Sequence, residues 1–137
     1  MATRLNPYLG FEDTARAAME FYRTVFGGDL AVSTFGEFGA SGPAADRVMH
    51  AQLETPSGFT LMASDTPEGA PPFERGTNMT VSLSGDERDV LAGYFERLAE
   101  GGTVTTPLEK QMWGDEFGML TDRFGIGWLV NIAGSPS

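Results

Sequence analysis

The chain has 137 residues, no cysteine, and 19 acidic against nine basic side chains, which gives a formal net charge of −10 at pH 7. The lack of cysteine excludes disulfides, thiol nucleophiles and cysteine-ligated metals, and the negative charge argues against nucleic acid or an anionic membrane surface as a partner. Because no secretion signal opens the chain and no apolar run approaches the roughly 20 residues of a membrane helix, we expect one soluble domain in the cytoplasm.

The first half of the chain predicts a strand, a helix and three further strands. Apolar and polar residues alternate over 4–11, which predicts a half-buried strand, and Pro7 is typical of an edge position. Asp13 or Thr14 is the expected cap of a helix that runs to about Val25 and ends at a pair of glycines. The later strands are predicted at 30–35, 47–54 and 59–64.

Two segments rich in glycine, proline and small residues separate these elements from their neighbours. Segment 36–46 predicts a mobile connection, and segment 66–76 predicts a linker. After the linker the pattern starts again, with a strand over 78–84 and a helix from about Glu87 to Glu100. The last strands are predicted at 103–106, 117–121 and 127–133.

Short sequence echoes indicate that the two halves repeat one module. Phe21-Tyr22-Arg23 is followed by Gly27-Gly28, and Phe95-Glu96-Arg97 is followed by Gly101-Gly102 in the same order. We therefore expect a single domain with three parts, which are module 1 at about 1–65, the linker at 66–76 and module 2 at about 77–137. The expected fold class is α+β, in which two tandem βαβββ modules form one curved, cup-shaped mixed sheet of eight strands with both helices on its convex face.

The sequence resembles the vicinal oxygen chelate superfamily, which has the glyoxalase and bleomycin-resistance fold, and within it the PhnB-like branch. The resemblance implies paired βαβββ modules and a homodimer. Its known activities include isomerases, dioxygenases, thiol transferases and proteins that bind drugs without catalysis, so it implies a fold more strongly than a reaction. The segments that carry it are Pro7-Tyr8-Leu9-Gly10-Phe11, Phe21-Tyr22, Phe26-Gly27-Gly28, Met49-His50-Ala51, Leu61-Met62, Ser64-Asp65, Trp113-Gly114-Asp115, Phe117-Gly118, Thr121-Asp122, Phe124-Gly125 and Trp128.

The metal site that the resemblance implies lacks its usual ligands. In metal-using members of the superfamily the ligands come from the first and last strands of each module, and here those positions hold Asn6, Met62, Thr80 and Leu129. Thioether and aliphatic groups serve a divalent transition metal poorly, and amide or hydroxyl oxygens bind it weakly. We expect no cofactor, although a rebuilt metal site that uses His50 with Asp65 or Asp115 stays open.

Strand alternation predicts which side chains face the cup. His50 is the only histidine, and we expect it to be the candidate catalytic base, against the alternative that it is a structural histidine. Trp113 lies in a predicted loop and could close over the cup. The glutamates and aspartates at strand ends, among them Glu54, Asp65 and Asp122, are expected to be surface carboxylates. The candidate ligand-binding residues are Asn6, Tyr8, His50, Gln52, Met62, Thr80, Trp113 and Phe117.

Three functions are compatible with these residues. The leading hypothesis is a metal-independent protein that binds a small organic molecule in the cup. The alternative is an enzyme of the same fold, of the lyase, isomerase or dioxygenase type, with His50 as base or as ligand of a rebuilt metal site. The third is a dimeric module without ligand chemistry, which a cup filled by side chains would favour.

Overall fold

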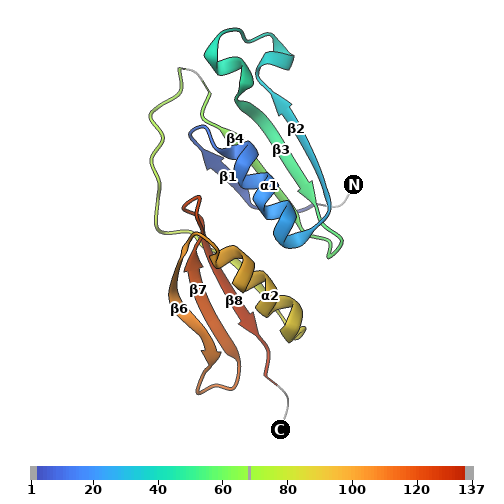
Figure 1. The fold of residues 1–137 in the computed structure, drawn as a ribbon, viewed down its shortest axis with the longest axis vertical. Helices are drawn as coiled ribbons and strands as arrows, with labels where there is room; N and C mark the ends of the chain where they lie inside the picture. Colours follow the sequence, from blue (N-terminus) through green and yellow to red (C-terminus); the bar gives the residue numbers. More distant parts are fainter. Residues whose placement is uncertain (1–2, 68, 135–137) are drawn as a thin grey trace. The chain divides into compact units, whose positions relative to one another are not determined.

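The computed structural model describes residues 3–67 and 69–134 and divides the chain into two compact units, Met1–Glu74 and Arg75–Ser137 (Figure 1). Each unit contains one α-helix and a four-stranded mixed sheet. The expected α+β class and the two βαβββ modules are confirmed. The strands of each unit pair as one four-stranded sheet.

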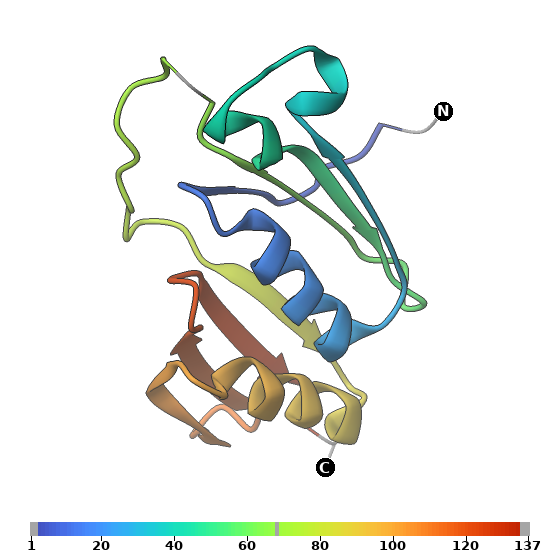
Figure 2. The ribbon, with the colours of Figure 1, turned by 45° about the horizontal axis from the view of Figure 1, so that its top comes forward.

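In unit 1 the first strand pairs with the last. The strand order is β1-β4-β3-β2, in which β1 runs parallel to β4 and the other neighbours are antiparallel. Two short 3₁₀ turns join β2 to β3 (Figure 2). The elements are β1 (Tyr8–Phe11), α1 (Ala15–Phe26), β2 (Asp29–Thr34), η1 (Gly36–Phe38), η2 (Pro43–Asp46), β3 (Val48–Glu54) and β4 (Thr60–Asp65).

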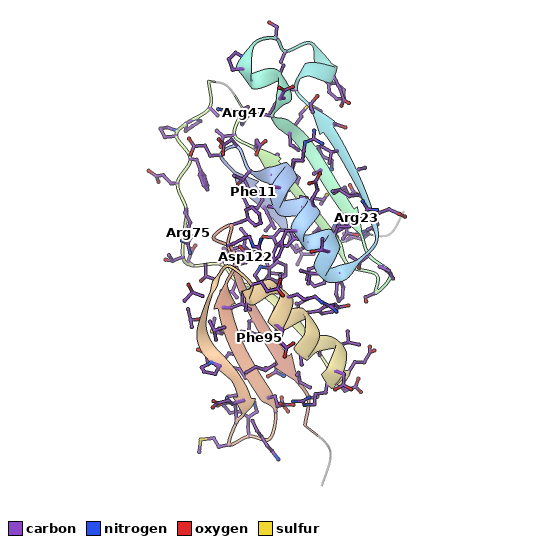
Figure 3. The ribbon with its side chains drawn as sticks, viewed as in Figure 1. Phe11, Arg23, Arg47, Arg75, Phe95 and Asp122 are labelled. Carbon is purple, nitrogen blue, oxygen red and sulfur yellow. The ribbon has the colours of Figure 1, made fainter. Side chains whose placement is uncertain are left out.

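The core of unit 1 lies between α1 and one face of its sheet. Phe11 of the sheet, labelled in Figure 3, and Tyr22 of the helix are both buried. Each buried apolar side chain of this size stabilises the fold by about 1.5–3 kcal/mol relative to an exposed one. Because successive strand residues point to opposite faces, burying Ala51, Leu53 and Leu61 under α1 turns their neighbours to the helix-free face. The buried apolar residues of the sheet are Leu9, Phe11, Val48, Ala51, Leu53, Leu61 and Ala63.

A buried carboxylate fastens the start of α1. Asp65, at the end of β4, is only 3% exposed, and its two oxygens accept hydrogen bonds from the amides of Ala15 and Val48, each at 2.8 Å. Thr14 occupies the N-cap position without a side-chain bond to the helix. The expectations of a cap from Asp13 or Thr14 and of a surface carboxylate at Asp65 were therefore wrong, because a residue distant in sequence supplies the acceptor.

Unit 2 repeats the arrangement with the order β5-β8-β7-β6. Its helix covers one face of the sheet, and Trp128, Leu98 and Val130 are completely buried. Asp122 is 4% exposed and its Oδ2 accepts the indole N–H of Trp128 at 2.9 Å, which corrects our expectation of a surface group there. The elements are β5 (Val81–Gly85), α2 (Arg88–Ala99), β6 (Thr103–Lys110), β7 (Glu116–Thr121) and β8 (Gly127–Ile132).

The repeated glycine pairs have a common structural cause. Gly27 and Gly101 follow the two helices with φ of 75°, a conformation that other residues rarely adopt. The second glycine of each pair passes against a strand end, since a Cβ at Gly28 would collide with the carbonyl oxygen of Glu54 and one at Gly102 with that of Thr121. The echo therefore marks the same tight crossing in both units.

Several predicted boundaries were wrong at the ends of elements. The strand expected over 4–11 begins only at Tyr8, after Pro7, which has no N–H for a ladder. The strand expected over 78–84 begins at Val81, and Met79, within the expected range, is 83% exposed. Strand β6 runs on to Lys110 through irregular pairing that tolerates a proline at an edge, and the expected mobile connection 36–46 contains η1 and η2.

Candidate functional site

The helix-free face of the unit 1 sheet carries most of the polar side chains that we expected to contact a ligand. Tyr8 on β1 lies opposite Met62 on β4, which in turn lies opposite Gln52 on β3, so the three form a row across the sheet. His50 lies two residues before Gln52 and is half-buried. The register of three strands therefore gathers four of the candidate residues on one surface.

Hydrogen bonds connect these side chains into a chain. Tyr8 Oη is 3.1 Å from His50 Nδ1, and their rings lie 5.7 Å apart. The other imidazole nitrogen, His50 Nε2, is 3.3 Å from Gln52 Oε1, and Gln52 Nε2 donates to Glu54 Oε1 at 2.6 Å. Both imidazole nitrogens therefore have partners, which holds the ring in one orientation.

The row of hydrogen bonds ends at the carboxylate of Glu54, which lies near several donors. Thr60 Oγ1 donates to Glu54 Oε2 at 2.8 Å, Arg4 hydrogen-bonds Thr60, and the guanidinium of Arg4 is 3.9 Å from Glu54. The hydrogen bonds from Thr60 and Gln52, with a further contribution from the charge of Arg4, lower the pKa of Glu54 below its usual value. Glu54 is therefore ionised at neutral pH.

Sequence reasoning missed the part of this site that lies beyond Gln52. Glu54 is exposed, as expected, but its bonds to Gln52 and Thr60 were not foreseen, and neither Thr60 nor Arg4 was a candidate. The spacing of His50, Gln52 and Glu54 by two residues places them on one strand face and was the signal that could have found the carboxylate. Arg4 precedes β1 and its contact with Thr60 depends on tertiary structure.

The other candidate residues lie elsewhere. Asn6 is half-exposed and precedes β1, while Thr80 is exposed and precedes β5, so both lie outside the strands that were expected to hold them. Trp113 is 63% exposed in the turn between β6 and β7, and its ring packs edge-on against Phe117 at 6.3 Å. Trp113 and Phe117 thus form a small aromatic pair within unit 2.

The donor set does not fit the divalent metal of the family. Met62 and Leu129 offer a thioether and an aliphatic group, and Asn6 and Thr80 offer only neutral oxygens. Among residues 3–67 and 69–134 no three histidine or acidic side chains gather as a metal site would require. Asp65 caps α1 on the opposite face of the sheet, which removes it as a partner of His50.

Asp115 is also engaged in its own unit. It accepts hydrogen bonds from Asn131 Nδ2 at 3.0 Å and from the amide of Gly134 at 2.9 Å. These hydrogen bonds lower the pKa of Asp115, and the bond from Asn131 contributes most to the shift. A carboxylate with both oxygens used in this way is held at the end of β8.

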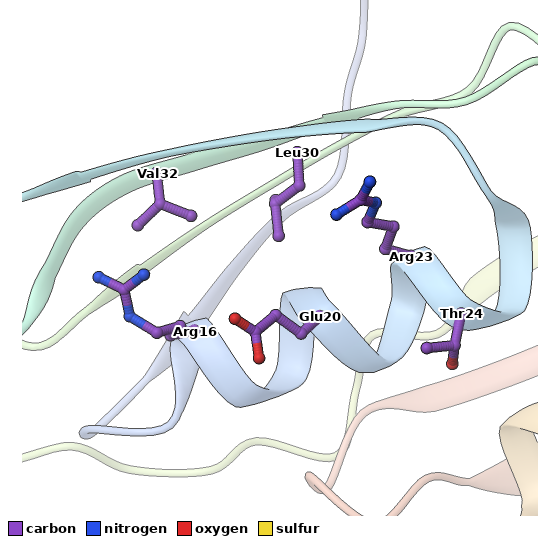
Figure 4. A pocket seen from close by; sticks show the side chains of 6 residues that line it. All are labelled: Arg16, Glu20, Arg23, Thr24, Leu30 and Val32. Carbon is purple, nitrogen blue, oxygen red and sulfur yellow. The ribbon is translucent and has the colours of Figure 1, made fainter.

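An open groove lies on the other side of the unit 1 sheet, between α1 and β2. The side chains of Arg16 and Arg23 extend from α1 toward β2, and Val32 and Leu30 of β2 point toward the helix (Figure 4). The groove has a volume of about 630 Å³, and Arg23 Nε donates to the carbonyl of Gly28 at 3.2 Å. One acidic side chain, Glu20, lies between the two arginines in its lining, which includes no histidine. The lining residues are Arg16, Glu20, Arg23, Thr24, Leu30 and Val32.

The paired βαβββ units and the polar helix-free face define a protein of the glyoxalase class. The chain belongs to the Glyoxalase/Bleomycin resistance protein/Dioxygenase superfamily, whose sequence model matches residues 4–130. This confirms the family resemblance and leaves the reaction open, because the fold carries many activities.

Individual relatives cover nearly the whole chain. The crystal structure of protein PA1353 from Pseudomonas aeruginosa is 39% identical, with a TM-score of 0.85 over 96% of this chain and 98% of that one. A PhnB protein from Bacillus cereus, described as a putative 3-demethylubiquinone-9 3-methyltransferase, is 25% identical with a TM-score of 0.76 over 96% and 100%. The uncharacterized protein Mb0911c from Mycobacterium bovis is 36% identical over 92% of this chain and 80% of its own. The likeness to the PhnB-like branch is therefore supported by structure.

Neither α-helix in the part of the chain that the structure describes has the length and apolar character that crossing a membrane requires.

Proposed function

We propose that this protein binds a small organic molecule on the helix-free face of unit 1, without a metal ion, and that Tyr8, His50 and Gln52 are its polar contacts. The observation that carries the proposal is the hydrogen-bonded chain from Tyr8 through His50 to Glu54. Ligand sites combine apolar surface with a few fixed polar groups, and the thioether of Met62 supplies apolar surface within this row.

The lack of suitable metal donors supports the metal-free form of the proposal. We would measure metal content by elemental mass spectrometry on tag-free protein and on the His50→Ala variant. Substoichiometric metal in both proteins is expected. A stoichiometric metal that is lost in His50→Ala would overturn the proposal and indicate a rebuilt metal site.

Ligand binding itself is tested by a thermal-shift screen of small oxygen-bearing metabolites. Hits should stabilise the wild type and Thr105→Ala, a control on the exposed part of β6, and should lose most of their effect with His50→Ala and Tyr8→Phe. Hits that stabilise all four proteins equally would place binding away from this face.

The second candidate is an enzyme of the same fold with His50 as general base. The observation that favours it is the 3.1 Å contact between Tyr8 Oη and His50 Nδ1, a distance over which an imidazole can remove a proton. Incubation of each hit with the protein, followed by mass spectrometry and NMR of the products, separates the two functions. Chemical change that stops with His50→Ala supports the enzyme, and unchanged ligand supports binding alone.

The proposal includes a homodimer, which the family resemblance implies, and a location in the cytoplasm, which was expected from the sequence. Light scattering coupled to size exclusion should give twice the mass of the 14.7 kDa chain. A monomer at micromolar concentration would remove the dimer from the proposal and leave the ligand site unaffected. We expect neither nucleic acid nor membrane as a partner, and mobility-shift and vesicle-sedimentation assays would show either.

A further inference from the structure

The hydrogen-bonded chain on the helix-free face has a defined direction. Ionised Glu54 can only accept hydrogen bonds, so the group of Gln52 that faces it at 2.6 Å must be the amide NH₂. The carbonyl oxygen of the same amide then faces His50. One carboxylate thus decides which way round the Gln52 side chain lies.

The orientation of Gln52 in turn selects the tautomer of His50. Because Gln52 Oε1 accepts, His50 Nε2 must carry the proton that is donated across 3.3 Å. A neutral imidazole with a proton on Nε2 has a lone pair on Nδ1, and Tyr8 Oη must therefore donate to it across 3.1 Å. Every donor from Tyr8 onward points toward Glu54.

The direction of these hydrogen bonds determines what the hydroxyl of Tyr8, at the end opposite Glu54, can offer a ligand. With its own proton given to His50, the exposed hydroxyl of Tyr8 has only lone pairs left to offer a ligand. Met62, the strand neighbour of Tyr8, provides apolar surface on the same sheet face. An alcohol, a phenol or an N–H group on an apolar body matches both features, whereas an ether or a ketone oxygen does not.

We propose that Glu54 is a positioning residue that fixes His50 as its Nε2–H tautomer, and that Tyr8 Oη accepts a hydrogen bond from a hydroxyl or N–H group of the ligand. The second half rests on the proposed function. The first half holds for the protein without a ligand, so the two halves can fail separately.

The tautomer is measured on the free protein by long-range ¹H–¹⁵N NMR of the imidazole ring. Since the chain has one histidine, the spectrum needs no assignment by mutation. In its neutral form, the wild-type ring should show Nε2 protonated and Nδ1 unprotonated as a single tautomer. In Glu54→Gln the residue at 54 can donate or accept, Gln52 is free to turn over, and the ring shifts should move toward a mixture of tautomers.

Glu96→Gln, on the exposed face of α2, removes the same charge away from the site and should leave the ring shifts at wild-type values. A wild-type ring protonated on Nδ1, or shifts that Glu54→Gln leaves unchanged, would overturn the role of Glu54.

Phenol and anisole test the ligand half, because they share an aromatic ring and only phenol has a donor. Titrations followed by the His50 ring signals should show anisole binding about three- to tenfold more weakly, the effect of one net hydrogen bond. The difference should vanish in Tyr8→Phe. Equal affinities in the wild type would reject the donor requirement, and binding of neither probe would count against the proposed function while leaving the tautomer result intact.

Discussion

Single buried carboxylates organise both units of this protein. Asp65 joins the first amide of α1 to the first amide of β3, and Asp122 holds the indole of Trp128 together with the amides of Phe124 and Ile126. Buried acceptors of this kind are costly to leave unpaired. Asp65 and Asp122 therefore have a structural role, because their oxygens accept hydrogen bonds from the protein's own N–H groups.

The first prediction concerns Asp65. In Asp65→Asn one of the two acceptor oxygens becomes an NH₂ group that faces a backbone N–H, so the variant should lose about 1–3 kcal/mol of unfolding free energy. Urea denaturation followed by circular dichroism measures the loss. Asp29→Asn, at an exposed position of β2, should stay within about 0.5 kcal/mol of the wild type. A neutral result for Asp65→Asn would mean that water or another acceptor takes the place of the lost oxygen.

A second residue-scale prediction concerns pH. The hydrogen bond from Asn131 lowers the pKa of Asp115 from its reference value of 3.8, and a carboxyl whose folded pKa is depressed stabilises the fold above its unfolded pKa. The contribution is therefore present above about pH 4 and is lost as the pH falls through the lower, folded value. The urea midpoint of the wild type should fall more steeply below about pH 4 than that of Asn131→Ala.

The control for this comparison is Asn78→Ala, which changes an exposed asparagine outside the strands and should follow the wild-type pH dependence. Parallel curves for the wild type and Asn131→Ala would show that the bond to Asp115 does not carry the effect.

At the scale of helices and strands, local patterns predicted which elements exist better than where they end. Alternation correctly predicted strand β3 and placed His50 and Gln52 on one face. It could do so because Ala51 and Leu53, which point to the other face, are buried. It could not find the cap of α1, because the acceptor comes from Asp65, far along the chain. The alternation pattern also started the first strand at residue 4, before Pro7. The pattern was not followed as far as Glu54, which continues the row of His50 and Gln52.

The glycine crossings after the two helices give a prediction at the same scale. Gly28→Ala and Gly102→Ala would each press a Cβ against the carbonyl of a strand end, so each should destabilise its unit by about 1–3 kcal/mol. Gly93→Ala is the matched control, since a Cβ there meets nothing within 4 Å inside α2. Alanine is the better helix former, so this control should gain about 0.5–1 kcal/mol. Thermal unfolding of the three variants measures both signs, and a stabilised Gly102→Ala would contradict the crossing.

At the scale of the whole molecule, the two units share one design and differ in chemistry. Both place a helix on one sheet face and pair the first strand with the last in parallel. Only unit 1 carries a histidine and its chain of polar partners. The repeated pattern of strands, helix and glycines therefore predicted the class of fold, whereas the site had to come from residues that the repeat does not share.

Metal removal gives a prediction for the whole protein. If the protein works without a metal, as proposed, dialysis against EDTA should leave its melting temperature unchanged, because only the loss of a bound ion would destabilise the folded state. Scanning calorimetry before and after dialysis measures this. A fall in melting temperature that added zinc or nickel reverses would contradict metal independence.

The parallel pairing of β1 with β4 determines the order in which the site can assemble. Strands β2, β3 and β4 follow one another and can pair as soon as they are made, but β1 must wait for a partner that ends at Asp65. Closing such a long loop is slow compared with forming a hairpin. Tyr8 therefore reaches His50 only once β1 has paired with β4, so the row of polar side chains is complete only when segments more than 50 residues apart have come together.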